Sequence, residues 1–305
     1  MAIPYITADM VEARLSWGAV ADAIIAGSKA AAPKIGDQFL REGDNTLLSR
    51  AAWIAGMGIG VKSVTVMPGN AANGLPSIHG AMLVFDDATG QIEAVIDSDL
   101  VTKWKTAADS LAGARLLARA DAARLMVIGA GRVAESVIDA YRSHWPELDV
   151  MVWARKPAQA EALANAKGAR LATDLPRAVA RADIIATATM AKEPVLWGEW
   201  LHPGQHIDLI GAFTADMREA NDTALQRAKI FVDSRATTVG HIGELMIPLA
   251  SGAITEAQIL GELPDLATGR AGRHSAQDIT LFKNGGGAHL DLMTARLILD
   301  IYRGA

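Results

Sequence analysis

Residues 125–134 read LMVIGAGRVA, an apolar run that turns through two glycines and then continues as a helix-forming segment. A G-x-G-x-x-A pattern directly after a strand is typical of the phosphate-binding turn of a dinucleotide fold. Gly129 permits the tight bend, Gly131 lets a pyrophosphate approach the backbone, and Ala134 lets the helix pack close to the strand. Because the turn lies in mid-chain, flanking segments must supply the substrate pocket.

Strands and helices alternate after this turn. The expected strands are 124–128, 149–153, 183–187, 206–210 and 229–232, and the expected helices include 132–143 and 157–166. This alternation predicts an α/β fold with a Rossmann-type, doubly wound parallel sheet and helices on both of its faces.

The chain before the turn follows a different pattern. Helical spacing in 8–32 predicts a helix pair, alternation in 46–96 predicts a meandering sheet, and a helix is expected over about 99–118. The C-terminal segment predicts a Gly-rich turn and an amphipathic helix that packs back onto the first domain. We therefore expect an α+β substrate-binding and dimerisation domain from 1–117 and 280–305, and a dinucleotide-binding domain from 118–279.

The composition excludes several classes of protein. With 305 residues, half of them hydrophobic, the chain has room for two domains. A net charge of -5 gives no reason to expect nucleic acid or an anionic membrane as a partner. The absence of cysteine excludes disulfides and thiolate chemistry, and the histidine spacing implies no metal. The first residues do not resemble a signal peptide and no segment is typical of a membrane span, so the cytoplasm is the expected location.

The second expected strand ends in Ala154-Arg155-Lys156. A site that prefers NAD places Asp or Glu near this position to hold the ribose 2′-hydroxyl. Two cations and no carboxylate favour a 2′-phosphate, because Arg155 can bind one with a planar fork of donors. The alternative is that both cations only decorate the strand end. NADPH is therefore the preferred cofactor in this interpretation, with NAD as the second option.

Further cofactor contacts are expected where the strands end, because ligands bind there in such sheets. Phe213 is either a wall of the nicotinamide pocket or a core aromatic. Lys283 and Gly285 form a loop able to approach the cofactor, although the glycine could equally serve a helix-entry turn. The complete expected cofactor set is Thr106, Gly129, Ala130, Gly131, Arg132, Val133, Ala154, Arg155, Lys156, Thr189, Met190, Ile210, Phe213, Lys283 and Gly285.

Lys62 is the unusual charge in the first part of the chain. Strand alternation places it on the same face as two valines, where a lysine needs a partner, a ligand or a route to water. The pattern alone favours a lysine at the sheet margin with its ammonium in water. Ser77 could offer a hydroxyl to the same pocket or be a turn serine. Lys105 and Asp109 form by default an exposed i,i+4 pair, or Lys105 binds a substrate carboxylate or cofactor phosphates.

These motifs together resemble the ornithine cyclodeaminase/mu-crystallin family over nearly the whole chain. The resemblance rests on GVKSVTVMPGN, GLPSIHG, DATGQIEAVID, LVTKWKTAADSLAGARLLAR, VIGAGRVA, DLIGAFTADMREAN and DITLFKNGGGAHLD, which occur in matching order. The family includes cyclodeaminases, ketimine reductases of cyclic imino acids, alanine dehydrogenase and a thyroid-hormone-binding crystallin. The resemblance implies a homodimer formed through the first domain, with the active site between the domains.

Four substrate-side residues follow from the resemblance by position. It implies that Lys62 is the substrate-binding lysine and that the Ser77 hydroxyl contacts substrate. Lys105 stands where most members have arginine, so the charge is kept but the bidentate fork is lost. Arg50 is the residue that we expect to supply the missing guanidinium.

Phe213 is the main departure from the cyclodeaminases of this family. In them the equivalent position looks like an aspartate, which moves protons during the reaction. Phenylalanine cannot transfer protons. Asp216 and Glu219 lie nearby in the sequence, on the far side of the loop in this interpretation.

The resemblance and Phe213 together predict an NAD(P)H-dependent reductase of a small imino acid. The expected substrate is Δ1-pyrroline-2-carboxylate or its six-membered homologue, with the carboxylate held by Lys62 and either Lys105 or Arg50. Three alternatives stay open: an ornithine cyclodeaminase that recycles bound NAD, a reductase of an acyclic imine such as iminosuccinate, and a non-catalytic crystallin-like binding protein.

Overall fold

The computed structural model describes residues 2–304. It divides into two compact units, of which unit 1 comprises Met1–Lys105 and Gly287–Ala305 and unit 2 comprises Thr106–Gly286. The boundaries expected from the sequence, 117/118 and 279/280, fall at the end of helix α3 (Ser98–Leu117) and the start of strand β14 (Thr280–Lys283). The assignment of substrate and cofactor roles to the two parts of the chain stays a prediction.

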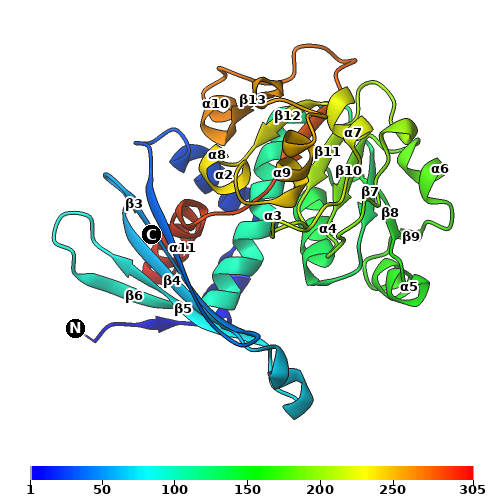
Figure 1. The fold of residues 1–305 in the computed structure, drawn as a ribbon. Helices are drawn as coiled ribbons and strands as arrows, with labels where there is room; N and C mark the ends of the chain where they lie inside the picture. Colours follow the sequence, from blue (N-terminus) through cyan, green and yellow to red (C-terminus); the bar gives the residue numbers. More distant parts are fainter. Residues whose placement is uncertain (1, 305) are drawn as a thin grey trace. The chain divides into compact units, whose positions relative to one another are not determined.

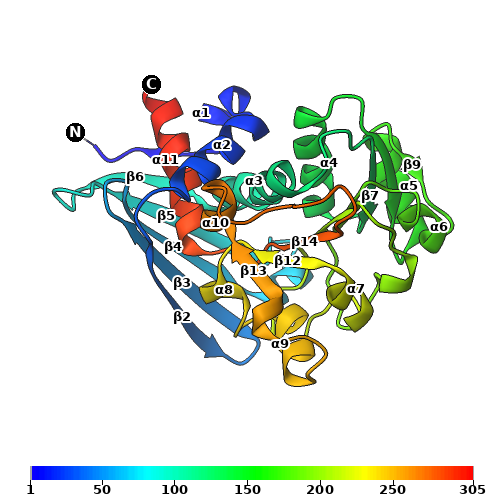
Figure 2. The same ribbon diagram turned by 90° about the horizontal axis from the view of Figure 1, so that it is seen from above.

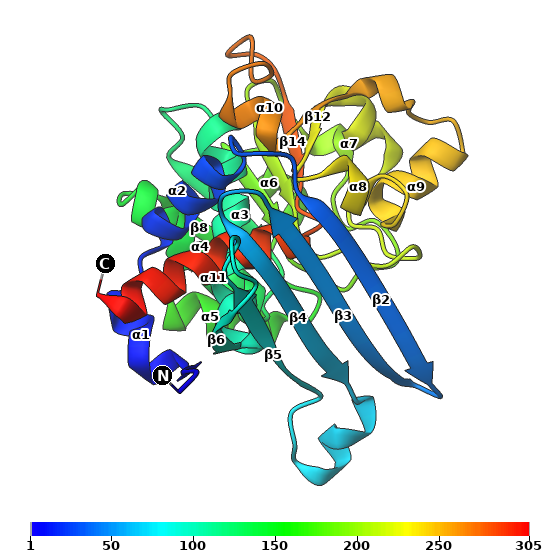
Figure 3. The ribbon, with the colours of Figure 1, turned by 90° about the vertical axis from the view of Figure 1, so that its left-hand side faces the viewer.

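Unit 1 is built on one mixed sheet. Its strands are β1 (Tyr5–Ile6), β2 (Lys34–Glu42), β3 (Asn45–Ile54), β4 (Gly58–Val66), β5 (Ile78–Phe85) and β6 (Ile92–Asp97). Within the described residues their order is β1-β6-β5-β4-β3-β2, so β3 to β6 form the antiparallel meander expected over 46–96, β2 extends it, and β1 pairs parallel to β6. Figure 3 shows β2 to β5 side by side. The sequence pattern did not indicate β2, which is almost wholly exposed and forms by pairing with β3 along its whole length.

Helices cover one face of this sheet. They include α1 (Ala8–Val11), α2 (Trp17–Gly27), the first part of α3 and the C-terminal α11 (Ala288–Arg303). α11 packs across β2 to β5 and against α2. Two glycines allow this close approach: a Cβ on Gly60 would lie 3.2 Å from the Leu292 side chain, and one on Gly27 would lie 2.6 Å from Met293. The expected return of the C-terminal helix to the first part of the chain is therefore observed.

Unit 2 holds an all-parallel sheet. Its strands are β7 (Arg124–Ile128), β8 (Asp149–Trp153), β9 (Arg170–Leu171), β10 (Ile184–Thr187), β11 (His206–Leu209), β12 (Lys229–Val232), β13 (Ile259–Glu262) and β14. In the described part of the chain they lie in the order β13-β12-β14-β11-β10-β7-β8-β9. This confirms the predicted doubly wound α/β fold. The order reverses on either side of β7, which makes its carboxyl end the switch point where such sheets bind ligands.

The helices of unit 2 are α4 (Arg132–His144), α5 (Pro157–Ala166), α6 (Leu175–Val179), α7 (Asp222–Arg227), α8 (Arg235–Thr238), α9 (Gly243–Ala250) and α10 (Leu263–Ala267), after the second part of α3. α4 packs on β7, and α5 packs on β8 and β9 (Figures 1 and 2). No helix of the described residues is both long and apolar enough to cross a membrane.

Candidate active site

The turn after β7 has the geometry of a phosphate-binding loop. Gly129 has φ +133°, and a Cβ there would lie 2.4 Å from the Ala188 carbonyl oxygen, so only glycine fits. Its N–H donates to the Trp153 carbonyl at 2.8 Å, which ties the turn to β8. A Cβ on Gly131 would meet nothing within 4 Å, and Ala134 is fully buried. The three small residues therefore do what the motif requires: bend, leave open space and allow close packing.

The open space lies at the N-terminus of α4, a helix of 13 residues. Gly131, Arg132 and Val133 are exposed there and Ala130 is half-buried. The first backbone N–H groups of a helix have no intrahelical acceptor and carry partial positive charge, so they bind phosphate well. This end of β7 fits the pyrophosphate of a dinucleotide.

Arg155 and Lys156 follow β8 and are exposed, while Ala154 is half-buried. Within the described residues, neither of these two cations forms an ion pair. No carboxylate stands at 154–156 to bind a ribose 2′-hydroxyl. The two cations are thus available to an anionic ligand.

Apolar side chains lie exposed in the loops after β10 and β11. Met190 is 78% exposed and Phe213 is 59% exposed, whereas Ile210 is buried. Large exposed apolar side chains at the carboxyl edge of a parallel sheet are typical of a ligand surface. Phe213 is therefore a surface residue, and the alternative that it is a core aromatic is wrong.

The carboxylates near Phe213 already have partners. Asp216 accepts hydrogen bonds from Lys192 Nζ at 2.7 Å and Thr214 Oγ1 at 2.6 Å, and these lower its pKa to about 2. Glu219 is fully buried and accepts hydrogen bonds from loop backbone. Both carboxylates are therefore engaged by neighbouring groups of the same loops.

Lys283 has a different place from the one expected. It has no exposed surface, burial lowers its pKa, and Nζ donates to the carbonyls of Leu209 at 2.9 Å and Asn284 at 2.7 Å. The prediction that this ammonium contacts cofactor is therefore corrected: it joins the ends of β11 and β14. A Cβ on Gly285 would lie 2.4 Å from Thr238 Cγ2, so this glycine is required for packing. Thr106 is half-buried, and its carbonyl accepts from Asn284 Nδ2 at 2.9 Å.

Lys62 is buried in the centre of unit 1. It is 6% exposed, and Nζ donates to Asp291 Oδ1 on α11 at 2.8 Å and to Thr102 Oγ1 on α3 at 3.3 Å. Burial lowers the pKa of Lys62, and Asp291 opposes that shift. The interpretation of a margin lysine with its ammonium in water is wrong. The sequence did not reveal Asp291 or Thr102 as partners, because both lie on helices far from β4 in the chain.

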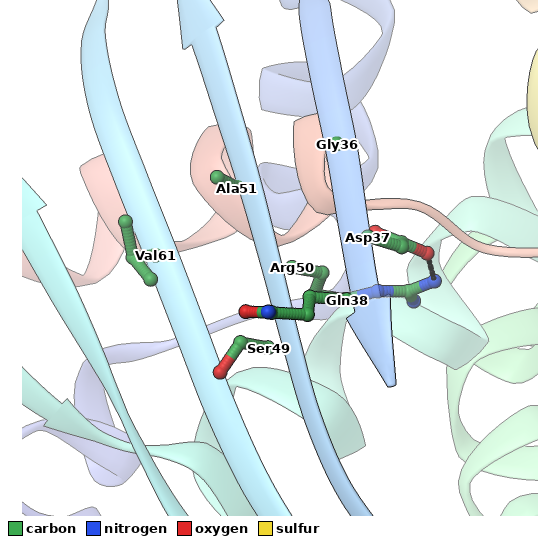
Figure 4. A pocket seen from close by; sticks show the side chains of 7 residues that line it. All are labelled: Gly36, Asp37, Gln38, Ser49, Arg50, Ala51 and Val61. Atoms are coloured by element: carbon green, nitrogen blue, oxygen red, sulfur yellow. Dashed lines mark hydrogen bonds and ion pairs between the residues drawn. The ribbon is translucent and has the colours of Figure 1, made fainter. Parts of the chain in front are cut away.

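The register brings a second cation beside Lys62. Asp37, Arg50, Lys62 and Met82 are directly opposite one another on β2, β3, β4 and β5, so they share the face that α11 covers. Arg50 forms an ion pair with Asp37 at 2.5 Å (Figure 4). Arg50 therefore lies directly beside Lys62 in the sheet, and its expected role in binding substrate stays a prediction.

Lys105 is also close enough to interact with this cluster. It is 6% exposed and Asp109 is fully buried, so the expected exposed surface pair is wrong. The cations Lys62, Lys105 and Arg50 together lower the pKa of Asp291, although burial alone would raise it. His289 on α11 lies in the same cluster, and burial lowers its pKa to about 4, so it is neutral near pH 7.

Ser77 does not lie beside Lys62. It precedes β5, and its carbonyl accepts from the Met67 N–H at 2.7 Å. Lys62 instead pairs with Met82, five residues further along the chain. At about 3.3 Å per residue this is a separation of ~16 Å, so the expectation of one shared pocket is corrected.

A cavity of about 290 Å³ opens on the other face of the same strands. Its lining residues are Gly36, Asp37, Gln38, Ser49, Arg50, Ala51 and Val61 (Figure 4). Alternation along β3 directs Ser49 and Ala51 away from the face that carries the Arg50 and Lys62 side chains. Asp37 and Arg50, which also line the cavity, belong to the cation cluster as well, so the two features adjoin at these residues.

Comparison with known proteins identifies similar chains. The model of the ornithine cyclodeaminase/mu-crystallin family matches residues 22–305. A Delta(1)-pyrroline-2-carboxylate reductase of Paracoccus denitrificans (strain Pd 1222) is 53% identical over 298 residues, which cover 95% of this chain and 94% of the relative. The structure of Thermococcus litoralis Delta(1)-pyrroline-2-carboxylate reductase with NADH and L-proline superposes with a TM-score of 0.89 at 26% identity, covering 99% and 98% of the two chains. An archaeal alanine dehydrogenase dimer with bound NAD has a TM-score of 0.91 at 25% identity, covering 100% and 97%.

The buried pair Lys62–Asp291 makes a testable prediction about stability. Asp291→Asn leaves a buried ammonium without its carboxylate, so we expect the free energy of unfolding to fall by about 3 kcal/mol. Lys62→Met has a similar effect, and the double variant loses clearly less than the sum of the single losses. Urea unfolding of the four proteins gives the coupling energy.

The matched control is the exposed pair Lys103–Glu12, whose side chains are 42% and 34% exposed. A double-mutant cycle with Lys103→Met and Glu12→Gln should give a coupling below about 1 kcal/mol. An equal coupling for the two pairs contradicts the assignment of Lys62–Asp291 as a desolvated ion pair.

Proposed function

The chain belongs to the ornithine cyclodeaminase/mu-crystallin family, and from that premise we propose that it reduces Δ1-pyrroline-2-carboxylate to proline with NAD(P)H. The reductase with 53% identity supports this substrate class, since the two chains align over nearly their full lengths. The observation that carries the proposal is the cluster of cationic side chains around Lys62. A small anion with an imine bond next to its carboxylate suits such a cluster.

Cationic side chains gather around Lys62. Lys105 and Arg50 lie with it around the Asp291 carboxylate, and Arg50 also pairs with Asp37. An ammonium has three donors, and Asp291 and Thr102 take two of those on Lys62. The third donor serves the substrate carboxylate, and the rigid pair with Asp291 fixes its direction.

Reduction of a protonated imine needs no strong general acid or base from the protein. When bound, the reduced nicotinamide supplies hydride to the imine carbon. The protonated imine is already electrophilic, so this chain has only to bind and orient it and exclude water. Phe213 in place of an aspartate, with Asp216 held by Lys192 and Glu219 buried, supports reduction over the deamination and ring closure of a cyclodeaminase.

NADPH is the cofactor that we propose as preferred. Arg155 and Lys156 are exposed after β8, where no carboxylate repels a 2′-phosphate. The relatives with bound NADH and NAD support the dinucleotide site itself. NADH is the second cofactor that the site accepts in this proposal.

The proposed assembly is a homodimer formed through the outer face of the six-stranded sheet of unit 1. Leu40 and Leu47 are directly paired across β2 and β3 and are 54% and 36% exposed. Trp53, 47% exposed, and the half-buried Val61 and Leu83 extend this apolar surface. An apolar face of this kind is typical of a protein interface. The related archaeal alanine dehydrogenase is a dimer.

Substrate kinetics test the proposed reaction. With NADPH, Δ1-pyrroline-2-carboxylate should give a higher kcat/KM than its six-membered homologue or iminosuccinate. Lys62→Met should lower kcat/KM by about 100-fold, mainly through KM, because a charge-assisted hydrogen bond to the carboxylate is lost. Lys103→Met, which removes an exposed lysine, is the control and should leave kcat/KM unchanged. Ammonia release from ornithine without added NAD(P)H would instead identify a cyclodeaminase, and tight binding without turnover a binding protein.

The cofactor preference makes a separate prediction. Arg155→Ala should lower kcat/KM with NADPH by about tenfold and leave kcat/KM with NADH unchanged, because only NADPH carries the 2′-phosphate. Arg177→Ala, which removes another exposed arginine of unit 2, should change neither value. Equal losses with both cofactors, or a wild-type preference for NADH, would overturn the assignment.

The dimer interface is tested by light scattering. The wild-type chain should have the mass of a dimer, and Val61→Glu should have the mass of a monomer because it places a charge in the apolar contact. Leu260→Glu, at an exposed leucine of unit 2, should remain dimeric. A dimeric Val61→Glu variant or a monomeric wild type rules out this face.

A further inference from the structure

Glu219 occupies a buried position between two loops of unit 2. Its Oε1 accepts from the Thr189 N–H at 2.8 Å and the Thr189 Oγ1 hydroxyl at 2.7 Å. Its Oε2 accepts from the N–H groups of Gly211 at 2.6 Å and Ala212 at 3.3 Å. Thr189 follows β10, and Gly211 and Ala212 follow β11. One carboxylate therefore joins the loops at the carboxyl ends of two adjacent strands.

The backbones of these loops are in direct contact at Gly211. A Cβ at this position would lie 2.0 Å from the Thr189 carbonyl oxygen and 2.5 Å from Glu219 Oε1. No other residue fits without moving one of the loops. This contact therefore sets the separation between the two loops, and the Glu219 carboxylate lies between them.

The backbone of Glu219 is also held by hydrogen bonds. Glu244, also fully buried, accepts from the Glu219 N–H at 2.7 Å and the Ala220 N–H at 2.9 Å. The Glu219 carbonyl accepts from the N–H groups of Val195 at 2.8 Å and Leu196 at 2.9 Å. Burial lowers the pKa of Lys283 and raises the pKa of Glu244 to about 7, and the attraction between this ammonium and the glutamates opposes both shifts. Both the side chain and the backbone of Glu219 are therefore fixed.

A carboxylate is the one side-chain group of this size that can accept all the hydrogen bonds offered between the two loops. All four of its partners are donors, and an ionised carboxylate only accepts. A glutamine would direct its NH₂ group at one pair of these partners and leave at least one backbone N–H without an acceptor. Leaving a buried donor unsatisfied costs about 1–3 kcal/mol.

The two loops carry the exposed apolar side chains described above. Met190 follows Thr189 directly, and Phe213 follows Ala212 directly. We propose that Glu219 is a positioning residue that fixes the separation of Met190 and Phe213, and so the width of the slot that receives the nicotinamide ring. This rests on the proposed function only in taking the ligand to be a nicotinamide dinucleotide. Glu219 itself touches neither cofactor nor substrate, because it has no exposed surface.

The experiment compares two ligands that differ only in the ring. The dissociation constants of NADH and of ADP-ribose, which lacks nicotinamide, are measured by calorimetry on the wild-type chain and on Glu219→Gln. The 2′-phosphorylated forms of both ligands are measured alongside. We expect Kd for NADH to rise about tenfold in the variant, from the lost hydrogen bonds, and Kd for ADP-ribose to stay within about twofold. With saturating NADH, kcat should fall and KM for the imino acid should change little.

Two further variants keep the test decisive. Thr189→Val preserves volume and removes one hydrogen bond to Glu219, so it gives a smaller rise in the NADH Kd even where Glu219→Gln folds poorly. Glu199→Gln is the matched control, because Glu199 is an exposed glutamate of unit 2 that accepts from Asn221 and Thr223 side chains. It should change neither constant, and thermal unfolding checks that each variant is folded.

The outcomes separate the two proposals. An unchanged NADH Kd in Glu219→Gln, or equal rises for NADH and ADP-ribose, overturns the positioning role. A wild-type chain that binds NADH but reduces no imino acid overturns the proposed reaction and leaves the positioning role supported. A wild-type chain that binds no nicotinamide dinucleotide overturns both.

Discussion

The ion pair between Lys62 and Asp291 is the constraint on which unit 1 depends. It joins the middle of a sheet to a helix 229 residues later in the chain, and both side chains are almost completely buried. A buried charge is tolerated only with a well-placed partner, so β4 and α11 must reach their final positions together. This explains why the C-terminal helix belongs to the unit built by the first hundred residues, although a whole second unit lies between them.

In unit 2, buried carboxylates pair with backbone N–H groups instead of with a lysine. Its loops at the carboxyl ends of β10, β11 and β14 would leave N–H groups without acceptors, and buried carboxylates supply those acceptors. Glu219 serves Thr189, Gly211 and Ala212, and Asp233 serves Gly285 and Gly286 at 2.8 and 2.5 Å. These hydrogen bonds join each loop to a neighbouring element. In our proposal for Glu219, such contacts set the places of the exposed side chains at this edge.

The sequence predicted the features that depend on local pattern. The strands 124–128 and 149–153 coincide with β7 and β8, because each is an apolar run bounded by turn residues. The four-residue β14 was missed, because the segment was assigned to the Gly-rich turn that follows it, and the strand pairs with β11 and β12 on both sides. At the site, alternation marked Lys62 as unusual, but no local signal identifies Asp291 as its partner. Ser77 and Lys283 were misplaced because strand register and burial are properties of the folded chain.

The two units contribute different chemistry. The charges around Lys62 all belong to unit 1, whereas the exposed Met190 and Phe213 belong to unit 2. An imino acid presents a carboxylate, which needs a cation, and an imine carbon, which needs only a close and dry approach once its nitrogen is protonated. A cyclodeaminase must in addition move protons beside the nicotinamide. In this chain position 213 is a phenylalanine, the Asp216 carboxylate pairs with Lys192, and the Glu219 carboxylate accepts from Thr189. In the proposed reaction, the cations around Lys62 in unit 1 would hold the substrate carboxylate, and unit 2 would have no proton to supply beside the nicotinamide.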